Sequence, residues 1–169
     1  VDSMNTVVLI GTSEPWGAVD ATAASVGAAS ASLLQDDGGA NTSYEIWGVE
    51  LGAVSAGTQT ISVDIAYGSS TRNTTLFAVQ LSNATLTAVV AVETDGSVGD
   101  THTVTLPGLG AGSYVFAVGS QTKDSLGTLG GVPEFAAGTN GANGWVFGGS
   151  ADMSGDVDVS YWPGSAMDK

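Results

Sequence analysis

The sequence predicts an all-β fold: an antiparallel β-sandwich of jelly-roll or immunoglobulin-like type, with about nine or ten strands in one domain spanning residues 1–169. Three observations lead to this prediction. Apolar and polar residues alternate with period two along most of the chain. Short turn signals made of Gly, Asp, Asn, Ser and Pro separate the alternating segments. A length of 169 residues is typical of a single domain.

The N-terminal part begins with Val7 to Ile10, a short apolar run that predicts a buried strand. The next segment, residues 21–35, is open to two interpretations. It is rich in Ala after Asp20, which is able to cap a helix. Its Gly, Ser, Thr and Val residues are poorer helix formers than Ala. They favour two strands, Thr22 to Val26 and Ala29 to Leu34, with a turn at Gly27.

Three further strands are expected before residue 82. Tyr44 to Leu51 carries apolar residues on both sides, which is typical of a central strand. Gln59 to Tyr67 is the clearest strand, because Ile61 and Val63 belong to an apolar set that alternates with polar or small residues. Thr74 to Leu81 follows the same pattern, with Phe77, Val79 and Leu81 on one side.

The second half of the chain contains five more candidate strands, separated by turns and one long loop. Pro107-Gly108-Leu109-Gly110 predicts a turn, and Gln121 to Gly144 has no clean period, which predicts a long surface loop. The candidate strands are Leu86 to Glu93, Thr101 to Leu106, Ser113 to Gly119, Trp145 to Gly149 and Asp156 to Trp162. Other turns are predicted at Asp36-Asp37-Gly38-Gly39, Gly68-Ser69-Ser70, Ser82-Asn83 and Asp95-Gly96.

The charge of the chain excludes several classes of partner. It has 3 Lys and Arg against 17 Asp and Glu, a formal net charge of −14. Such a field repels nucleic acid and anionic membranes, so neither is expected as a partner. No apolar stretch approaches the ~20 residues of a spanning helix, so no membrane insertion is expected. The absence of Cys excludes disulfides, thiolate nucleophiles and Cys-ligated zinc.

Candidates for catalysis are few, and the sequence predicts no enzyme. His102 is the single histidine, no G-x-S-x-G motif occurs, and His102 alternates with Thr101 and Thr103 in a predicted strand, which indicates a structural role. A glycosidase needs two carboxylates across a groove, and with 17 acids any pair is easy to propose. Solvated surface carboxylates are the simpler interpretation of the candidates Glu45, Glu50, Asp64, Glu93 and Glu134.

Calcium is the one cofactor that the composition favours, because Ca²⁺ requires oxygen ligands and negative charge. The acidic clusters lack EF-hand spacing, and Asp/Gly clusters are also ordinary turn chemistry. The candidate ligands are Asp36, Asp37, Asp95, Asp100, Asp152, Asp156 and Asp158.

Aromatic residues provide a candidate glycan-binding surface, because flat apolar rings stack on sugars. Core packing is the competing interpretation, and we expect it for Trp47. The candidate glycan-binding residues are Trp16, Trp145, Tyr161 and Trp162. Three N-x-[ST] sequons at Asn41, Asn73 and Asn83 fall in predicted loops or at strand edges, where a glycan would be solvated in a host that attaches one.

The run from Asn41 to Ala84 resembles a β-sandwich module of surface proteins from bacteria and their tailed phages. The similar features are the aromatic strand Tyr44-Glu45-Ile46-Trp47, the link Ala56-Gly57-Thr58, an alternating strand and the strand Ala78 to Leu81. The segment before this link, Gly52-Ala53-Val54-Ser55, lacks the Pro that often stiffens such connections. The resemblance implies an extracellular or virion-surface module and supplies no catalytic residues.

We therefore expect a non-enzymatic structural protein of an extracellular or virion surface, such as a virion decoration, spike or fibre component or a cell-surface module. It would act through protein neighbours in a homo- or hetero-oligomeric assembly, by pairing strand edges near either terminus. The alternative is a lectin-like module that binds a polysaccharide, with or without Ca²⁺.

Overall fold

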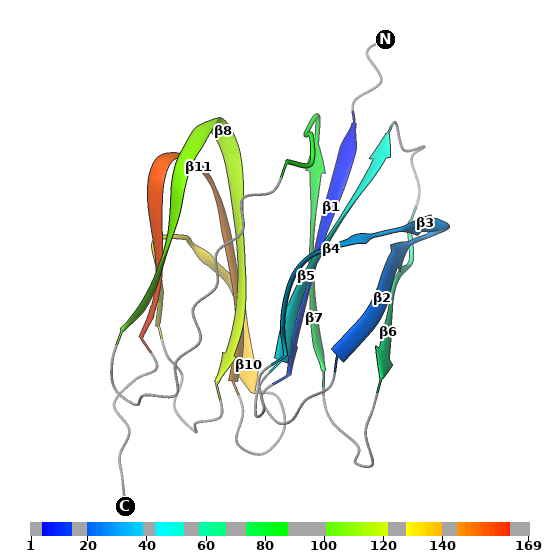
Figure 1. Cartoon of the computed structure of the whole chain (residues 1–169), viewed down its shortest axis with the longest axis horizontal. Helices are drawn as coiled ribbons and strands as arrows, with labels where there is room; N and C mark the ends of the chain where they lie inside the picture. The colour runs from blue at the N-terminus through cyan, green and yellow to red at the C-terminus, as the bar shows by residue number, and fades with distance from the viewer. Residues whose placement is uncertain are drawn as a thin grey trace, which may run out of the picture.

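The computed structural model describes residues 5–14, 20–38, 43–52, 58–66, 74–87, 101–121, 128–139 and 145–162. The regular structure in these residues is entirely β-strand, arranged in three antiparallel sheets, which confirms the all-β prediction. None of the described residues forms a helix long and apolar enough to cross a membrane. Figure 1 shows three layers side by side, with one sheet in the centre and one on each side of it.

Within the described residues, eleven strands make up the three sheets. The central sheet has the order β4-β5-β1-β7, formed by β4 (Ser32–Gly38), β5 (Ser43–Gly52), β1 (Thr6–Glu14) and β7 (Thr75–Ser82). The second sheet has the order β3-β2-β6, formed by β3 (Ala29–Ser30), β2 (Asp20–Val26) and β6 (Ile61–Ala66). The third has the order β10-β11-β8, formed by β10 (Glu134–Thr139), β11 (Trp145–Trp162) and β8 (His102–Gln121), and β9 (Thr128–Gly130) also pairs with β11.

The ambiguous segment 21–35 folds as strands. Gly27 makes the turn after β2 with a φ of +58°, and its N–H donates to the carbonyl of Thr60 at 2.8 Å. The strand predicted from Ala29 to Leu34 is divided at Ala31, whose N–H donates to the carbonyl of Ala24. On one side of Ala31 the chain pairs with β2, and on the other it pairs with β5. The segment therefore crosses between two sheets.

The strand β1 is buried on both faces, since it lies inside the middle layer. Val8 and Ile10 belong to a core between the central sheet and β3-β2-β6, together with Trp47, which confirms the prediction that Trp47 packs in the core. Val7 and Leu9 point to the opposite side, toward β8. A continuous apolar run is what a strand covered on both faces requires.

The strands β8 and β11 form one bent, two-stranded ribbon, here called the β8–β11 ribbon. Its pairing runs from Gln121 opposite Trp145 to His102 opposite Tyr161, with register shifts around Gly155. In Figure 1 both strands arch over at the top and return. A core of Val115, Val132 and Val157, with half-buried residues such as Leu106 and Val159, lies within this third sheet.

The predicted turn at 107–110 is wrong, as is the division of this region into separate strands. Gly108, Gly112 and Gly155 have φ values of +64°, +77° and +79°, so the glycines do adopt a turn-like conformation. They bend the strands while the chain stays within the ladder, as β-bulges do. The predicted strands 101–106 and 113–119 therefore merge into β8, and 145–149 and 156–162 merge into β11.

The remaining predicted turns, the long loop and one strand have mixed outcomes. The predicted Ser82-Asn83 turn is confirmed, because β7 ends at Ser82 and Asn83 has a φ of +56°. Asp36 to Gly38, predicted as part of a turn, is instead the end of β4. The Gln121 to Gly144 segment contains β9 and β10, so it is not wholly a loop. The strand predicted from residue 86 is absent at 86–87, and residues 88–93 and the turns predicted at 68–70 and 95–96 lie outside the described residues.

Candidate functional site

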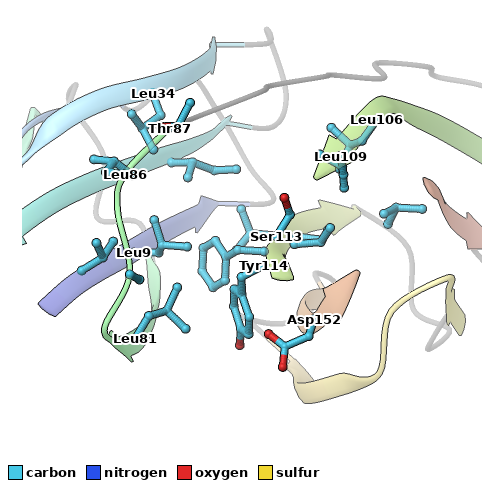
Figure 2. A pocket seen from close by; sticks show the side chains of 18 of the residues that line it. Leu9, Leu34, Leu81, Leu86, Thr87, Leu106, Leu109, Ser113, Tyr114 and Asp152 are labelled. Carbon is cyan, nitrogen blue, oxygen red and sulfur yellow. The ribbon is translucent and has the colours of Figure 1, made fainter. Parts of the chain in front are cut away.

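A groove of about 790 Å³ lies between the central sheet and the β8–β11 ribbon, and we call it the interlayer groove. Figure 2 shows Leu9 and Leu81 on one wall and Leu106 and Leu109 on the other, with Tyr114 between the walls. This volume falls within the range of small-molecule pockets, and its walls are largely apolar.

The central sheet and the β8–β11 ribbon touch at residues that also line the groove. A Cβ atom at Gly11 would collide with the side chain of Val118 and lie 3.1 Å from the Phe116 ring, so backbone of β1 packs directly on β8. Elsewhere, Leu34 and Leu86 meet over Gly48, since a Cβ there would lie 2.9 Å from a methyl carbon of each. Glycines at these positions allow the side chains of adjacent segments to approach the central sheet.

Ser113 and Asp152, which line the interlayer groove, do not form a Ser–His–Asp relay with His102. His102 begins β8, opposite Tyr161, whereas Ser113 and Asp152 lie beside the bend of the ribbon. Gly108, at the bend, is six positions after His102 along β8, about 20 Å at a rise of 3.3 Å per residue. A triad requires direct hydrogen bonds between its members, so this spacing does not serve it.

The candidate glycosidase carboxylates that the structure describes lie on different faces. Glu45 points between the central sheet and β2, with only 2% of its surface exposed. Glu50 lies an odd number of residues away on β5, so it points to the other face, where its Oε1 accepts a hydrogen bond from the N–H of Leu86 at 2.5 Å. Asp64 is exposed on β6, between inward-facing Val63 and Ile65. The side chain of Glu134, and the whole of Glu93, lie outside the described residues.

Glu45 belongs to a buried polar cluster that sequence reasoning missed. The hydroxyl of Thr12 donates to Glu45 Oε2 and accepts from the N–H of Glu45 at 3.3 Å, while the N–H of Ala21 donates to Glu45 Oε1 at 3.3 Å. Three strands, β1, β5 and β2, are thereby joined at one point. A signal was available in the sequence: Glu45 shares its strand face with Trp47 and Val49, where an acid is unusual.

The candidate calcium ligands are dispersed where they can be described. Asp36 is exposed on β4, and Asp152, Asp156 and Asp158 are exposed along β11. Asp156 accepts a hydrogen bond from the N–H of Gly108 at 2.8 Å, and Asp158 accepts one from the hydroxyl of Thr105 at 2.7 Å, so both tie β11 to β8. Across the described residues, no group of three or more His, Asp or Glu is arranged to hold a metal ion. Asp95, Asp100 and the side chain of Asp37 lie outside this description, and calcium binding stays a prediction.

The candidate glycan-binding aromatics are only partly covered by the structure. Trp145 begins β11, and Tyr161 and Trp162 end it. Because the ribbon bends, both ends of β11 run toward the same end of the molecule in Figure 1. The side chains of these three residues, and Trp16 as a whole, lie outside the described residues, so glycan binding stays a prediction.

One of the three sequons lies within the structure. Asn83 is exposed in the turn that follows β7, a position accessible to a modifying enzyme. Asn41 and Asn73 lie outside the described residues. Glycosylation stays a prediction at all three positions.

The edges of the sheets are the remaining candidate site. Strand β1 pairs with β5 on one side and β7 on the other, so it does not provide the edge that was expected near the N-terminus. Strand β11 pairs with β8 on one side, and on the other with β10 and β9 near its two ends. Among the described strands, the central sheet ends at β4 on one side and at β7 on the other, and β7 pairs with β1 through eight consecutive residues and no bulge. Leu76, on this strand, leaves 45% of its surface exposed.

Strand β7 differs from the other edge strands in the described part of the chain. Its sequence, TLFAVQLS, contains no charged residue, Pro or Gly. Protein sheets normally protect an edge with charges, Pro, bulges or a very short strand. The others have such features: Asp36 in β4, Asp64 in β6, Pro107 in β8, Glu134 in β10, and only two and three residues in β3 and β9.

Comparisons with protein-family models, curated proteins and solved structures find no match for this chain. The site must therefore be interpreted from its own geometry.

Proposed function

We propose that this chain is a non-enzymatic structural module of an extracellular or virion surface, held in place by protein neighbours at its sheet edges. Strand β7 is the observation that carries the proposal: among the described strands it ends the central sheet, and a neutral, unbulged strand at the end of a sheet is a template for pairing with another strand. The resemblance of residues 41–84 to surface modules of bacteria and tailed phages points to the same setting, and this run includes β7.

The layered arrangement supports the finer description of the fold in this proposal. The central sheet and β3-β2-β6 share one apolar core, which includes Ile10, Ala24 and Trp47. Two antiparallel sheets that share a core are the basis of a β-sandwich of jelly-roll or immunoglobulin-like type. The third sheet, which contains the bent β8–β11 ribbon, would then be a further layer packed on this sandwich.

The acidic surface is consistent with a repeated component of a large particle. Exposed acids such as Asp36, Glu50, Asp64 and Asp158 lie on different strands, so negative charge is distributed over the module. A net charge of −14 keeps such particles apart from one another in solution. A neighbour that binds by salt bridges would have to supply the positive charge.

Immunogold electron microscopy of the native source material tests the proposed function. An antibody against the folded chain is expected to label the surface of a particle, filament or cell at repeated positions. The chain should also leave that surface together with its neighbours when the assembly is dissociated. Recovery of the chain only as a free monomer, with no label on any surface, would overturn the proposal. Turnover of a polysaccharide by the purified chain would do so as well.

A further inference from the structure

We infer that the interlayer groove binds a small amphiphile, a molecule with one alkyl chain and a cationic head group. The alkyl chain would lie between the central sheet and the β8–β11 ribbon, and the head group would lie beside Asp152. This inference goes beyond the proposed structural function and does not depend on it.

The walls of the interlayer groove supply the apolar part of this site. Five leucines that line it are only half-buried, so each keeps apolar surface that a ligand would cover: Leu34, Leu81, Leu86, Leu106 and Leu109. In Figure 2 the first three lie on one side of the groove and the last two on the other. An alkyl chain between them would remove apolar surface of both walls from water, which is the main source of affinity for such a ligand. The volume of about 790 Å³ is sufficient for a molecule of this kind.

The charge of the interlayer groove favours a cation as the head group. Among the described residues that line it, Asp152 is the only carboxylate, and none is Lys or Arg. His102 also lines the groove, at the start of β8, whereas Asp152 lies beside the bend of the ribbon. The net charge of −14 adds a field that attracts cations and repels anions. A fatty-acid carboxylate would therefore be disfavoured, although its chain would suit the same walls.

Tyr114 lies next to the position expected for the head group. It is directly opposite Asp152 in the β8–β11 ladder, and directly opposed residues of antiparallel strands share a face. Figure 2 shows Asp152 beside the Tyr114 ring. An ammonium group donates hydrogen bonds to a carboxylate and is attracted to the face of an aromatic ring. Asp152 is exposed, so the ammonium would stay partly hydrated and its desolvation would cost little.

Calorimetric titration with ten-carbon probes is the first test. The probes are decylammonium, decanol and decanoate, each below the concentration at which it aggregates. Decylammonium is expected to bind saturably at one site, more tightly than decanol, with decanoate the weakest. Octylammonium should bind at least tenfold more weakly than decylammonium, because each methylene contributes about fourfold. Absence of saturable binding, binding at many equivalent sites, or a preference for decanoate would overturn the inference.

Removal of single charges then tests the head-group position. Asp152→Asn is expected to weaken decylammonium binding about twofold to fivefold and to leave decanol binding unchanged, since it removes a charge and keeps the shape. Asp64→Asn is the matched control, because it removes the same charge from β6, in the sheet on the other side of the central sheet (Figure 1). It should change binding less than about 1.5-fold at about 0.15 M NaCl, where the Debye length is about 8 Å. Equal weakening by both variants would overturn the assignment of the head group to Asp152.

A variant that fills the groove tests the alkyl-chain position. Ser113 is a small, half-buried residue of the interlayer groove, and Ser113→Trp is expected to weaken binding of decylammonium and decanol at least tenfold. Thr103→Trp is the control, because it places the same ring on an exposed residue of β8 that does not line the groove, and it should change binding less than twofold. Circular dichroism and the unfolding midpoint report whether each variant is folded.

Nuclear magnetic resonance of the native chain locates the ligand without any substitution. Titration with decylammonium is expected to shift the methyl signals of Leu81, Leu106 and Leu109, which line the groove, and to leave those of Leu33, which does not line it, unchanged. Shifts confined to residues outside the interlayer groove would overturn the inference. The proposed surface function is tested separately on native material, so it would stand or fall independently of this result.

Discussion

Gly11 of β1 lies directly against the side chain of Val118 of β8. A Cβ atom at position 11 would overlap Val118 and also lie 3.1 and 3.2 Å from two carbons of the Phe116 ring. The neighbouring residues of β1 are Val, Leu, Ile and Thr, so this is the position at which the described part of β1 lets the third sheet approach its backbone. The contact between the central sheet and the β8–β11 ribbon therefore depends on a missing side chain.

Gly11→Ala is expected to lower the free energy of unfolding by about 1–3 kcal/mol, the usual cost of overpacking a close contact. Chemical denaturation of the purified variant measures this change. Gly110→Ala is the matched control, because its Cβ would meet no atom closer than 3.9 Å. Val118→Ala should recover part of the loss in the Gly11→Ala background. Strictly additive effects of the two substitutions would contradict the proposed contact.

Thr12→Val is expected to lower the free energy of unfolding by about 1–3 kcal/mol, because it removes a hydroxyl donor from the buried carboxyl group of Glu45. Thr12→Ser keeps the hydroxyl and should cost clearly less. In a Glu45→Gln background, Thr12→Val is expected to cost less than in the native chain, since a hydrogen bond to a neutral amide contributes less than one to a carboxylate. A double-mutant cycle by denaturation measures this coupling, and a coupling energy near zero would refute it.

Asn83→Val is expected to destabilise the chain by about 1–2 kcal/mol, because a β-branched residue is strained at a φ of +56°. Asn83→Gly should be neutral within about 0.5 kcal/mol, since Gly adopts this conformation freely. Both variants lose the sequon, so Thr85→Val, which also removes it from an exposed position, separates glycosylation from backbone strain. Equal stability of the Val and Gly variants at position 83 would count against the strained turn.

Asp156→Ala is expected to speed hydrogen exchange of the Gly108 amide at least tenfold, because the carboxylate of Asp156 accepts the hydrogen bond from that amide. Nuclear magnetic resonance resolves the exchange of this single proton. Asp158→Ala is the matched control: its carboxylate accepts from the Thr105 hydroxyl, so it should leave the Gly108 amide protected. If both variants exposed Gly108 equally, the bend would be held by the strand ladder as a whole.

Local alternation was sufficient to predict several strands and the direction of their side chains. Ile61 and Val63 of β6 point inward, and Phe77 of β7 is buried, as the period of two indicates. The division at Ala31 was not predictable, because both halves read as strand and only their partners, β2 and β5, differ. The bend of β8 escaped prediction for a related reason. Gly108 and Gly112 signal positive φ equally well in a turn and in a bulge that remains paired.

The candidate site was likewise predictable from the sequence only in part. The neutral composition of β7 was visible in the sequence, but an uncharged strand is unremarkable in the interior of a sheet and becomes a pairing surface only at an edge. The order β4-β5-β1-β7 makes it an edge. The odd spacing of Glu45 and Glu50 already implies opposite faces of β5, but only the packing of β2 against the Glu45 face buries that carboxyl group.

By itself, then, the sequence determined the all-β class, the apolar face of strands such as β6 and β7, and a formal net charge of −14. These properties depend on side-chain chemistry and on a period that neighbouring residues define. Only the tertiary structure decided which strands are edges, where Gly11 admits Val118, and which carboxylates are buried. These features depend on contacts between segments far apart in the chain, and such contacts leave no local pattern because any compatible strand could have supplied the partner.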